Sequence, residues 1–293
     1  MKTRWDSITE DINFFISIAR NSVNFVLSSF KQEKGRGRNP KHSLADYVTL
    51  LVLKEYDKKS LRSAEGRLSN FVCKERVDHS VIAYWEQKHD VQIMLEKIIK
   101  HLGQRLMKYI PHDFSMIDAT KFSDWRKDET NFHLFNRISP KSVYPTGISF
   151  LTGSLASPVG EAIDQGGGKL YADAGYDDNK SIGIIFGKGY EPVVCPNKSR
   201  WKGYFRKKAR KIYNKFTNRL GYRQRGRGES CFGSLTNKFG DRLTTRNEQT
   251  IRTRIASRVI SYQIRLLMRT IRRLFHLIFR HAHGKERFLK NKN

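Results

Sequence analysis

The sequence predicts two consecutive regions: an all-helical region over residues 1–110 and an α/β region over residues 111–293, with a mixed sheet flanked by helices. In the first region, apolar residues recur at spacings of three and four, which is typical of amphipathic helices. After Pro111, the apolar runs become short and are separated by Gly and Pro, which is typical of strands. A chain of 293 residues also has the length of about two domains.

The helical region contains one helix over residues 8–30, a basic break over residues 34–42, and then further helical patterns. Residues 43–56, 60–71 and 79–87 form three short helices with tight connections, for which Ser60 and Ser80 are candidate N-caps. This outline is typical of a helix-turn-helix that reads DNA, although all-helical domains also produce it by chance. A longer helix over residues 91–109 completes the region.

The α/β region contains four strand-like runs, at residues 114–122, 143–151, 169–175 and 190–197. The glycines at 166–168 lack the Lys and the helix start of a phosphate-binding loop, so they predict a turn. Residues 251–279 have the spacing of an amphipathic helix, but seven arginines interrupt it. So many charges are too costly for a membrane span, and we expect this helix to lie on protein or on DNA.

Charge and cysteine content indicate a nucleic-acid partner and a reducing compartment. The 56 Lys and Arg against 28 Asp and Glu give a net charge of +28, which favours a polyanion as partner. The three cysteines have no ligand spacing, and no secretory signal opens the sequence, so we expect a cytoplasmic protein.

Basic residues concentrate between residues 196 and 228, where thirteen Lys and Arg occur without one acid. Aromatic residues interleave them, which suits a surface that meets backbone phosphates. A solvated helix face without a partner is the alternative. The candidate DNA-binding residues from this run are Lys198, Arg200, Arg223, Arg225 and Arg227.

Three acids are the candidates for chemistry. Asp118 and Asp173 each end an apolar run, where a strand delivers a side chain to the edge of a sheet. Glu229 begins a helical pattern, and Gly226 and Gly228 predict a loop before it. Together the three carboxylates offer hard oxygen ligands for two Mg²⁺ or Mn²⁺ ions, which serve in phosphodiester chemistry.

The contexts of these acids are IDATKF, YADAGYD and YRQRGRGESCFGSL, and the acids follow one another at intervals of 55 and 56 residues. In these motifs and in their order, the chain resembles the DDE transposases of prokaryotic insertion sequences, whose catalytic domain is ribonuclease H-like. The resemblance extends over about residues 43–273. The second interval has no room for the β-rich insertion of some members, so we expect a compact catalytic domain.

The resemblance implies a DNA transposase that cleaves transposon ends and joins the 3′-hydroxyl ends to target DNA. Asp118, Asp173 and Glu229 would be its catalytic residues and the ligands of two Mg²⁺ or Mn²⁺ ions. Tyr222 and Arg225 fit the family's spacing before the glutamate and would contact DNA near the cleaved end. Thr236 stands where the family often has Lys, so a catalytically inactive relative that represses end sequences is an alternative, as is a nuclease without strand transfer.

The same resemblance implies the partners. Residues 1–110 would bind the terminal inverted repeats, and residues 111–293 would form the catalytic domain with its C-terminal basic helix. The protein would act as a homodimer on paired double-stranded DNA ends and on target DNA, without a membrane, in the nucleoid of a prokaryotic cytoplasm.

Overall fold

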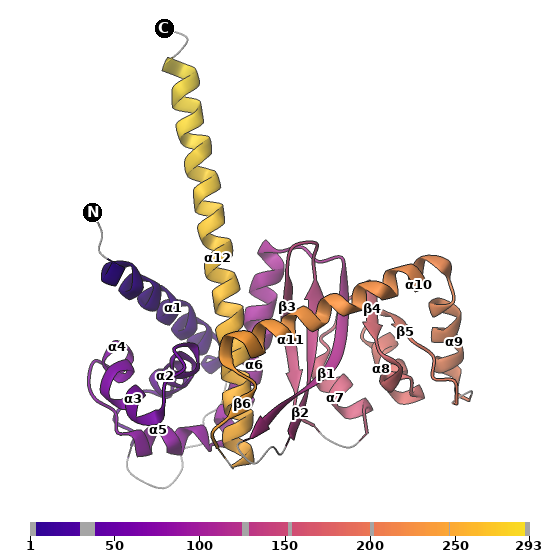
Figure 1. Ribbon diagram of the computed structural model, residues 1–293, viewed down its shortest axis with the longest axis horizontal. Coiled ribbons are helices and arrows are strands. Elements are labelled where there is room, and N and C mark those ends of the chain that lie inside the picture. Colours follow the sequence, from indigo (N-terminus) through magenta and orange to yellow (C-terminus); the bar gives the residue numbers. More distant parts are fainter. Residues whose placement is uncertain are drawn as a thin grey trace.

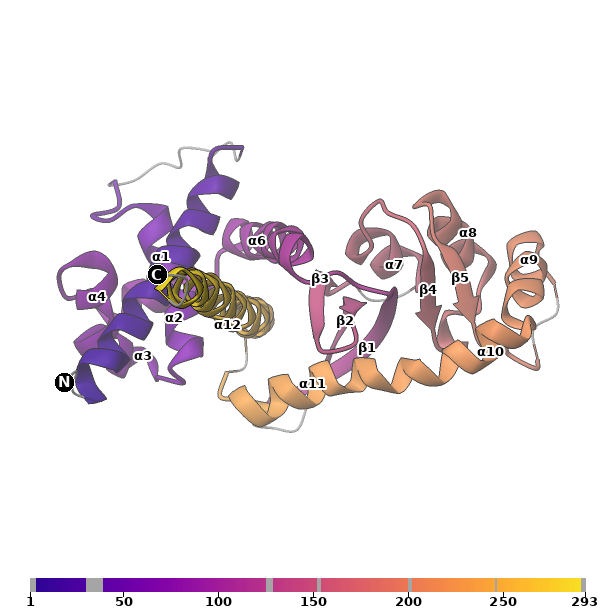
Figure 2. The same ribbon diagram turned by 90° about the horizontal axis from the view of Figure 1, so that it is seen from above.

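The computed structural model describes residues 4–29, 39–124, 129–151, 154–199, 202–245 and 247–290, and side chains within residues 11–276 of these ranges. Helices from the first third of the chain form one side of the molecule, and a sheet with its covering helices forms the other (Figure 1). The last helix, α12, runs between the two (Figure 2). The predicted fold class, an α/β region with a mixed sheet behind a helical region, is confirmed.

The N-terminal helices follow the predicted pattern closely. They are α1 (Arg4–Leu27), α2 (Leu44–Tyr56), α3 (Leu61–Ser63), the π-helical turn η1 (Ala64–Leu68), α4 (Ser69–Cys73), α5 (His79–Glu86) and α6 (His89–Tyr109). Ser43 and Ser60 cap α2 and α3, since their hydroxyls accept backbone N–H groups. The expectation for Ser80 was wrong: Asp78 caps α5 and accepts the N–H of Ser80 at 2.7 Å. A carboxylate one residue before the helix is the better placed acceptor.

The sheet has the strand order β3-β2-β1-β4-β5, and β6 pairs with the far end of β1. Its strands are β1 (Phe114–Asp124), β2 (Glu129–Ile138), β3 (Val143–Ser149), β4 (Lys169–Ala172), β5 (Glu191–Val194) and β6 (Arg242–Leu243). The first three strands are antiparallel, and β1, β4 and β5 are parallel. The parallel strands therefore bring the carboxyl ends of β4 and β5 to one edge, level with the middle of β1.

Helices cover both faces of the sheet (Figure 2). On one face α7 (Ala156–Ala162) and α8 (Asn179–Gly187) pack on Ile117 and Phe135, and α9 (Tyr204–Tyr213) lies beside β5. The other face is crossed by α10 (Phe216–Tyr222), the short turn η3 (Arg223–Arg225) and α11 (Gly226–Phe239). Within the described residues, β5 is the one strand between β4 and α11, so the catalytic region is compact, as expected.

Helix α12 (Glu248–Lys290) joins the two sides of the molecule into one core. Its residues Ile255, Val259 and Ile264 are buried, and the helix packs against α2, α6 and β3. One apolar cluster therefore extends from α1 through α12 to the sheet. The division into domains near residue 110 stays a prediction, because apolar packing continues across it. Within the described residues, no helix is both long enough and apolar enough to cross a membrane.

Candidate active site

Asp118 lies in the middle of β1, on the face of the sheet that α11 crosses. Its neighbours on this face, Met116 and Leu134, belong to the core shared with the helices, whereas Ile117 belongs to the opposite core. Its side chain is 13% exposed, and Oδ1 accepts the N–H of Ala119 at 3.0 Å. The strand thus holds one carboxylate near the surface, at the border of a buried face.

Asp173 follows directly after β4, which is the parallel neighbour of β1. Met116 pairs with Tyr171, so two residues further along the register Asp173 is level with Asp118. The side chain of Asp173 accepts the N–H of Gly175 at 2.9 Å and caps the 3₁₀ turn η2 (Ala174–Tyr176). Adjacent parallel strands therefore bring these two aspartates to the same level of the sheet, although Asp118 lies within its strand rather than at the predicted strand end.

Glu229 reaches the same place from α11. The predicted loop before Glu229 was wrong, because α11 begins at Gly226 and continues the helical run of α10 and η3. Gly228 is needed for packing rather than for a turn: a Cβ there would overlap the side chain of Met116. Helix α11 therefore contacts β1 directly where Gly228 meets Met116. Gly228 is the residue before Glu229, and Met116 is two residues before Asp118, so this contact brings the two acids near each other.

Arg225 connects the acids across this contact. Its guanidinium lies 3.5 Å from Asp118 Oδ2 and 3.9 Å from Glu229 Oε1. Burial raises the pKa of Asp118 to about 6; Arg225 counteracts this rise, and the nearby charges of Asp173 and Glu229 add to it. The three carboxylates thus form one electrostatic unit, which we call the carboxylate site (Asp118, Asp173 and Glu229).

The other candidate DNA-binding residues differ in how near they lie to the carboxylate site. Tyr222 donates its hydroxyl to Ala172 O at 3.2 Å, beside Asp173. Lys198 is exposed in the loop after β5, at the same edge of the sheet, and Arg223 is exposed one residue after Tyr222. Arg227 lies away from the acids and donates to Ser139 O at the turn between β2 and β3. Arg200 lies outside the described residues.

Two residues that the sequence did not suggest lie behind Asp173. His133 in β2 and Tyr176 in η2 are buried, and His133 Nδ1 lies 2.7 Å from the Tyr176 hydroxyl. Burial lowers the pKa of His133 and raises the pKa of Tyr176, which keeps both neutral. Tyr176 follows Asp173 by three residues within YADAGYD. This short spacing is the sequence feature that could have indicated a role for Tyr176 beside Asp173. The pair of His133 and Tyr176 fixes the turn that carries Asp173.

Other acids of this region have structural partners. Asp177 is buried, bonds Arg206 Nε and Nη2 at 3.0 and 2.7 Å, and accepts the N–H of Asn197. Asp178 caps α8 through the N–H groups of Lys180 and Ser181. Of the aspartates in residues 169–179, Asp173 is therefore the one directed to the carboxylate site.

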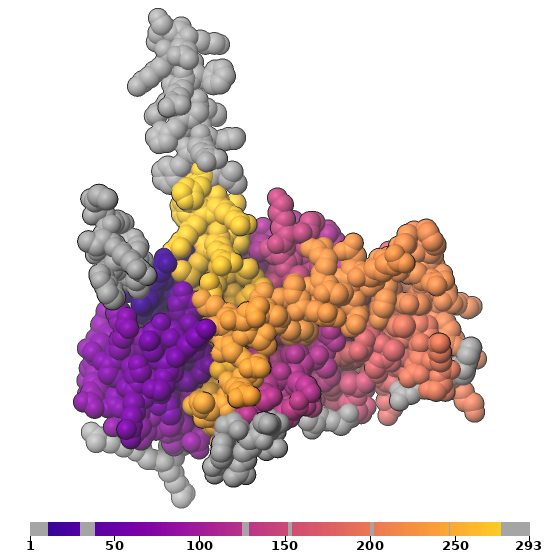
Figure 3. Space-filling model, in the orientation of Figure 1, coloured from indigo at the N-terminus to yellow at the C-terminus, as the bar shows by residue number. Residues whose placement is uncertain are grey.

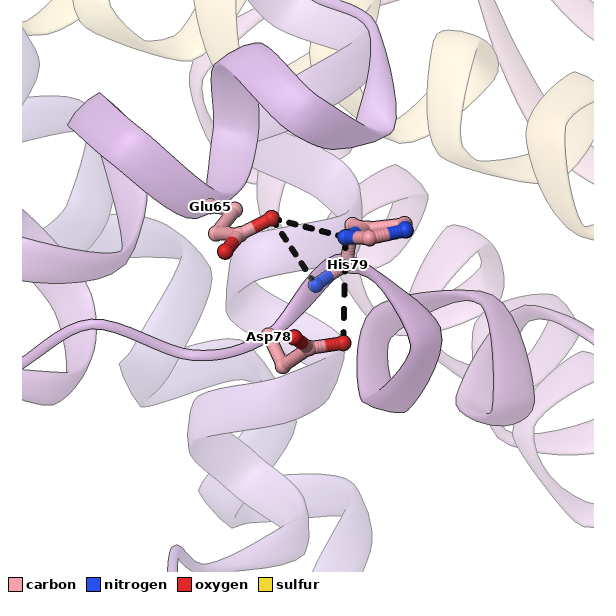
Figure 4. Close-up of side chains that lie close together, drawn as sticks. All are labelled: Glu65, Asp78 and His79. Atoms are coloured by element: carbon pink, nitrogen blue, oxygen red, sulfur yellow. Dashed lines mark hydrogen bonds and ion pairs between the residues drawn. The ribbon is translucent and has the colours of Figure 1, made fainter.

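A separate acidic group occurs in the helical region. Glu65, Asp78 and His79 are the one set of described residues whose possible metal-ligating atoms all lie within 4.8 Å (Figure 4). Arg76 Nε donates to Glu65 at 2.8 Å, and His79 Nδ1 lies 2.8 Å from the other oxygen of Glu65. A guanidinium thus already balances this carboxylate, and the group ties the start of α5 to η1.

The carboxylate site has the donors that a divalent cation requires. Carboxylate oxygens are the ligands preferred by Mg²⁺ and Mn²⁺. The raised pKa of Asp118 reflects burial and mutual repulsion that a cation would relieve. The site therefore fits hard metal ions in its chemistry.

Comparison with known protein families agrees with this geometry. Residues 112–264 match the transposase DDE domain, which is more than half of the 293 residues. The chain therefore belongs to the DDE transposases, and its mixed sheet with flanking helices is the ribonuclease H-like fold of such domains. The chain matches none of the curated proteins with which it was compared.

Proposed function

We propose that this transposase cleaves DNA at the ends of an insertion sequence and joins the 3′-hydroxyl ends to target DNA. The observation that carries the proposal is that Arg225 lies within 4 Å of both Asp118 and Glu229, while Asp173 is level with Asp118 on the neighbouring parallel strand and its charge raises the pKa of Asp118. The match to the transposase DDE domain spans all three acids and supports the same reaction.

In this proposal Asp118, Asp173 and Glu229 hold two Mg²⁺ or Mn²⁺ ions. When bound, such ions supply an activated water or 3′-hydroxyl and stabilise the leaving oxygen of a phosphodiester. Asp118 acts from within β1, and Asp173 acts from the turn that directly follows β4. Glu229, whose side chain is 66% exposed, acts from the helix and is free to adjust to metal and substrate. Arg225 moves from the acids to a DNA phosphate near the cleaved bond.

Basic and aromatic side chains around the site orient the DNA. Tyr222, Arg223 and Lys198 lie at the edge where β4 and β5 end, so a strand that reaches Asp173 passes over them. Arg200 would extend this surface. The helical region of residues 1–110 binds the terminal inverted repeats, and two copies pair the ends as a homodimer. We place this reaction on nucleoid DNA in a prokaryotic cytoplasm.

The test is the variant Asp173→Asn in a cleavage assay with Mg²⁺ and a labelled terminal repeat. Cleavage should fall by at least about 10³-fold, as expected when a metal ligand is lost, while binding to the same DNA persists. Asp178→Asn is the matched control, because Asn also caps helices and this aspartate faces α8. Undiminished cleavage by the Asp173 variant contradicts the proposal. A pre-cut 3′-hydroxyl end with target plasmid separates a transposase from a nuclease, since a nuclease does not join them.

Thr236 favours a second candidate, a catalytically inactive relative that binds end DNA as a repressor. Its hydroxyl is bonded to Phe232 O and Gly233 O within α11, so it offers no cation to DNA. Lys238 does not replace the missing lysine, because its ammonium lies 5.8 Å from the ring centre of Tyr56, toward the N-terminal helices. Binding of end DNA without any Mg²⁺-dependent nicking by the purified protein would support this candidate over the first.

A further inference from the structure

A second basic surface lies on the far side of α11. A groove of about 430 Å³ opens between the β2–β3 turn, α11 and α12. The face on which the orange α11 meets the yellow α12 is visible in Figure 3. We call it the basic groove, and its lining residues that matter here are Lys141, Arg227, Ser230, Ser234, Arg269 and Arg273.

The charge of the basic groove is uncompensated. Four of its lining residues are cations and none is an acid. Among the described residues, none of these four cations forms an ion pair, whereas Arg252 and Arg272 on the same helix pair with Glu248 and Asp11. Ser142, Ser230, Ser234 and Thr270 lie between the cations, but the hydroxyls of Ser230 and Thr270 already donate to Arg227 O and Leu266 O, so the cations are the main anion-binding groups. Such a lining suits an anion that carries several acceptor oxygens.

Further cations on α11 and α12 add to the positive potential near Arg269. Burial and the charge of Arg269 both lower the pKa of Arg265. The pKa of Lys238 is lowered by burial and by the charges of Arg265, Lys58 and Arg269. Like charges are thus crowded along this part of α12, and a bound polyanion would remove their repulsion.

The groove and the carboxylate site lie on opposite flanks of one helix. At 100° per residue, Arg225 and Glu229 differ by about 40°, whereas Arg227, Ser230 and Ser234 lie about 100–180° away from these two residues. Gly228, Cys231 and Leu235 are buried between the two flanks. One phosphate of a DNA strand therefore cannot contact both the carboxylate site and the basic groove.

We infer that the basic groove binds the phosphodiester backbone of a second DNA segment while another segment lies at the carboxylate site. The inference rests on the proposed function, because it takes DNA as the substrate. The groove offers four cations, and its one aromatic lining residue, Tyr262, is half-buried with its hydroxyl donated to Val143 O, so the groove suits the DNA backbone rather than the bases. A reaction that joins two DNA molecules needs a surface of this kind for each.

The test compares Arg269→Gln/Arg273→Gln with the control Arg252→Gln/Arg272→Gln, which removes two charges from the same helix outside the groove. Both groove arginines are exposed, so folding should be kept. Binding of a 30-base-pair duplex is measured by fluorescence anisotropy with EDTA at several salt concentrations. Loss of two phosphate contacts should make the slope of log K against log[salt] shallower by about 1.8, against less than about 0.5 for the control.

A second variant, Ser234→Glu, places a negative charge in the groove from α11 and should also weaken binding. Equal slopes for the groove variant and its control, or an unchanged affinity of the Ser234 variant, would overturn the inference. Cleavage assays distinguish this outcome from failure of the proposed function. A protein that cuts DNA but shows no slope change contradicts only the groove, and a shallower slope without any cutting contradicts only the proposed activity.

Discussion

Arg225 sets the charge balance between Asp118 and Glu229. A guanidinium within 4 Å of both carboxylates lowers their mutual repulsion in the absence of metal. In the proposed reaction, a divalent cation would take the carboxylate oxygens and leave this arginine free to bind a DNA phosphate. One side chain can therefore belong to the protein's own ion pairs in one state and to the DNA interface in the other.

Gly228 is the residue on which the approach of α11 to β1 depends. Gly228→Ala should lower the free energy of unfolding by about 1–3 kcal/mol, because the added methyl overlaps buried Met116. The nicking rate should also fall, since Glu229 is the next residue and moves with the helix. Urea unfolding and a nicking assay measure the two effects.

Gly233→Ala is the control for this substitution, because nothing lies within 4 Å of the added Cβ in the same helix. It should stabilise the protein by up to about 1 kcal/mol through helix propensity. If both glycine variants have the same stability and nicking rate, the close packing of α11 on β1 does not control the position of Glu229.

From the apolar runs before them, the sequence predicted that Asp118 and Asp173 both end strands at the edge of a sheet. The sequence located Asp173 correctly, directly after β4, but Asp118 lies in the middle of β1, because that strand continues to Asp124. The sequence did not predict the role of His133 or Tyr176. These residues are 43 positions apart and touch only after β2 and η2 are both in place. No local spacing links a residue in one strand with a residue in a distant turn.

At the scale of elements, two strands were missed, β2 and the two-residue β6, and the start of one helix was misplaced. Residues 132–138 of β2 are all buried, including the polar His133, Asn136 and Arg137, so the strand shows no alternation of apolar and polar residues. The start of α11 was misplaced because two glycines weaken a helix locally, whereas packing on Met116 requires one of them. Tertiary contacts overruled local propensity in both cases.

Helices α2, α5 and α12 meet through a buried group of charges. Lys54 lies 2.6 Å from Glu55 and 2.9 Å from Glu86, and Arg254 and Arg258 approach Glu86 and Glu55 at 2.9 Å. Arg258 also donates to Gly240 O at the end of α11. The group thus connects the helical region with the helix that carries Glu229.

Glu55→Gln should lower the free energy of unfolding by about 3–5 kcal/mol at pH 7, because it leaves buried cations without compensation. Burial raises the pKa of Glu55, but Lys54 and Arg258 outweigh burial and hold the pKa below its ordinary 4.5. The stability from this ionised carboxylate is therefore present above pH 4.5 and is lost as the pH falls through the folded pKa. Urea unfolding at several pH values should show the two proteins converging in acid.

The exposed pair of Glu248 and Arg252 provides the control for Glu55. Glu248 is 71% exposed on its side chain, so Glu248→Gln should change the free energy of unfolding by at most about 0.5 kcal/mol. A similar small effect of Glu55→Gln would mean that the buried charges do not hold the helices together.

At the scale of the whole molecule, the net charge of +28 is divided among several surfaces. Basic side chains occur at the edge beyond β5, along α9 to α11, and in the basic groove. We predict that affinity for duplex DNA falls about 10³- to 10⁵-fold between 50 and 200 mM salt, as for proteins that make 6–10 phosphate contacts. Anisotropy titrations check this, and a flat salt response would show that the charge serves another purpose.

The burial of Glu55 against Arg258 also bears on how the chain is made. Arg258 follows Glu55 by 203 residues, and synthesis at about 5–20 residues per second separates them by roughly 10–40 s. During that time the carboxylate of α2 and its neighbouring apolar surface have no α12 to cover them. Helix α2 thus reaches its final packing only after α12 has been made, and its apolar surface stays exposed in the nascent chain until then.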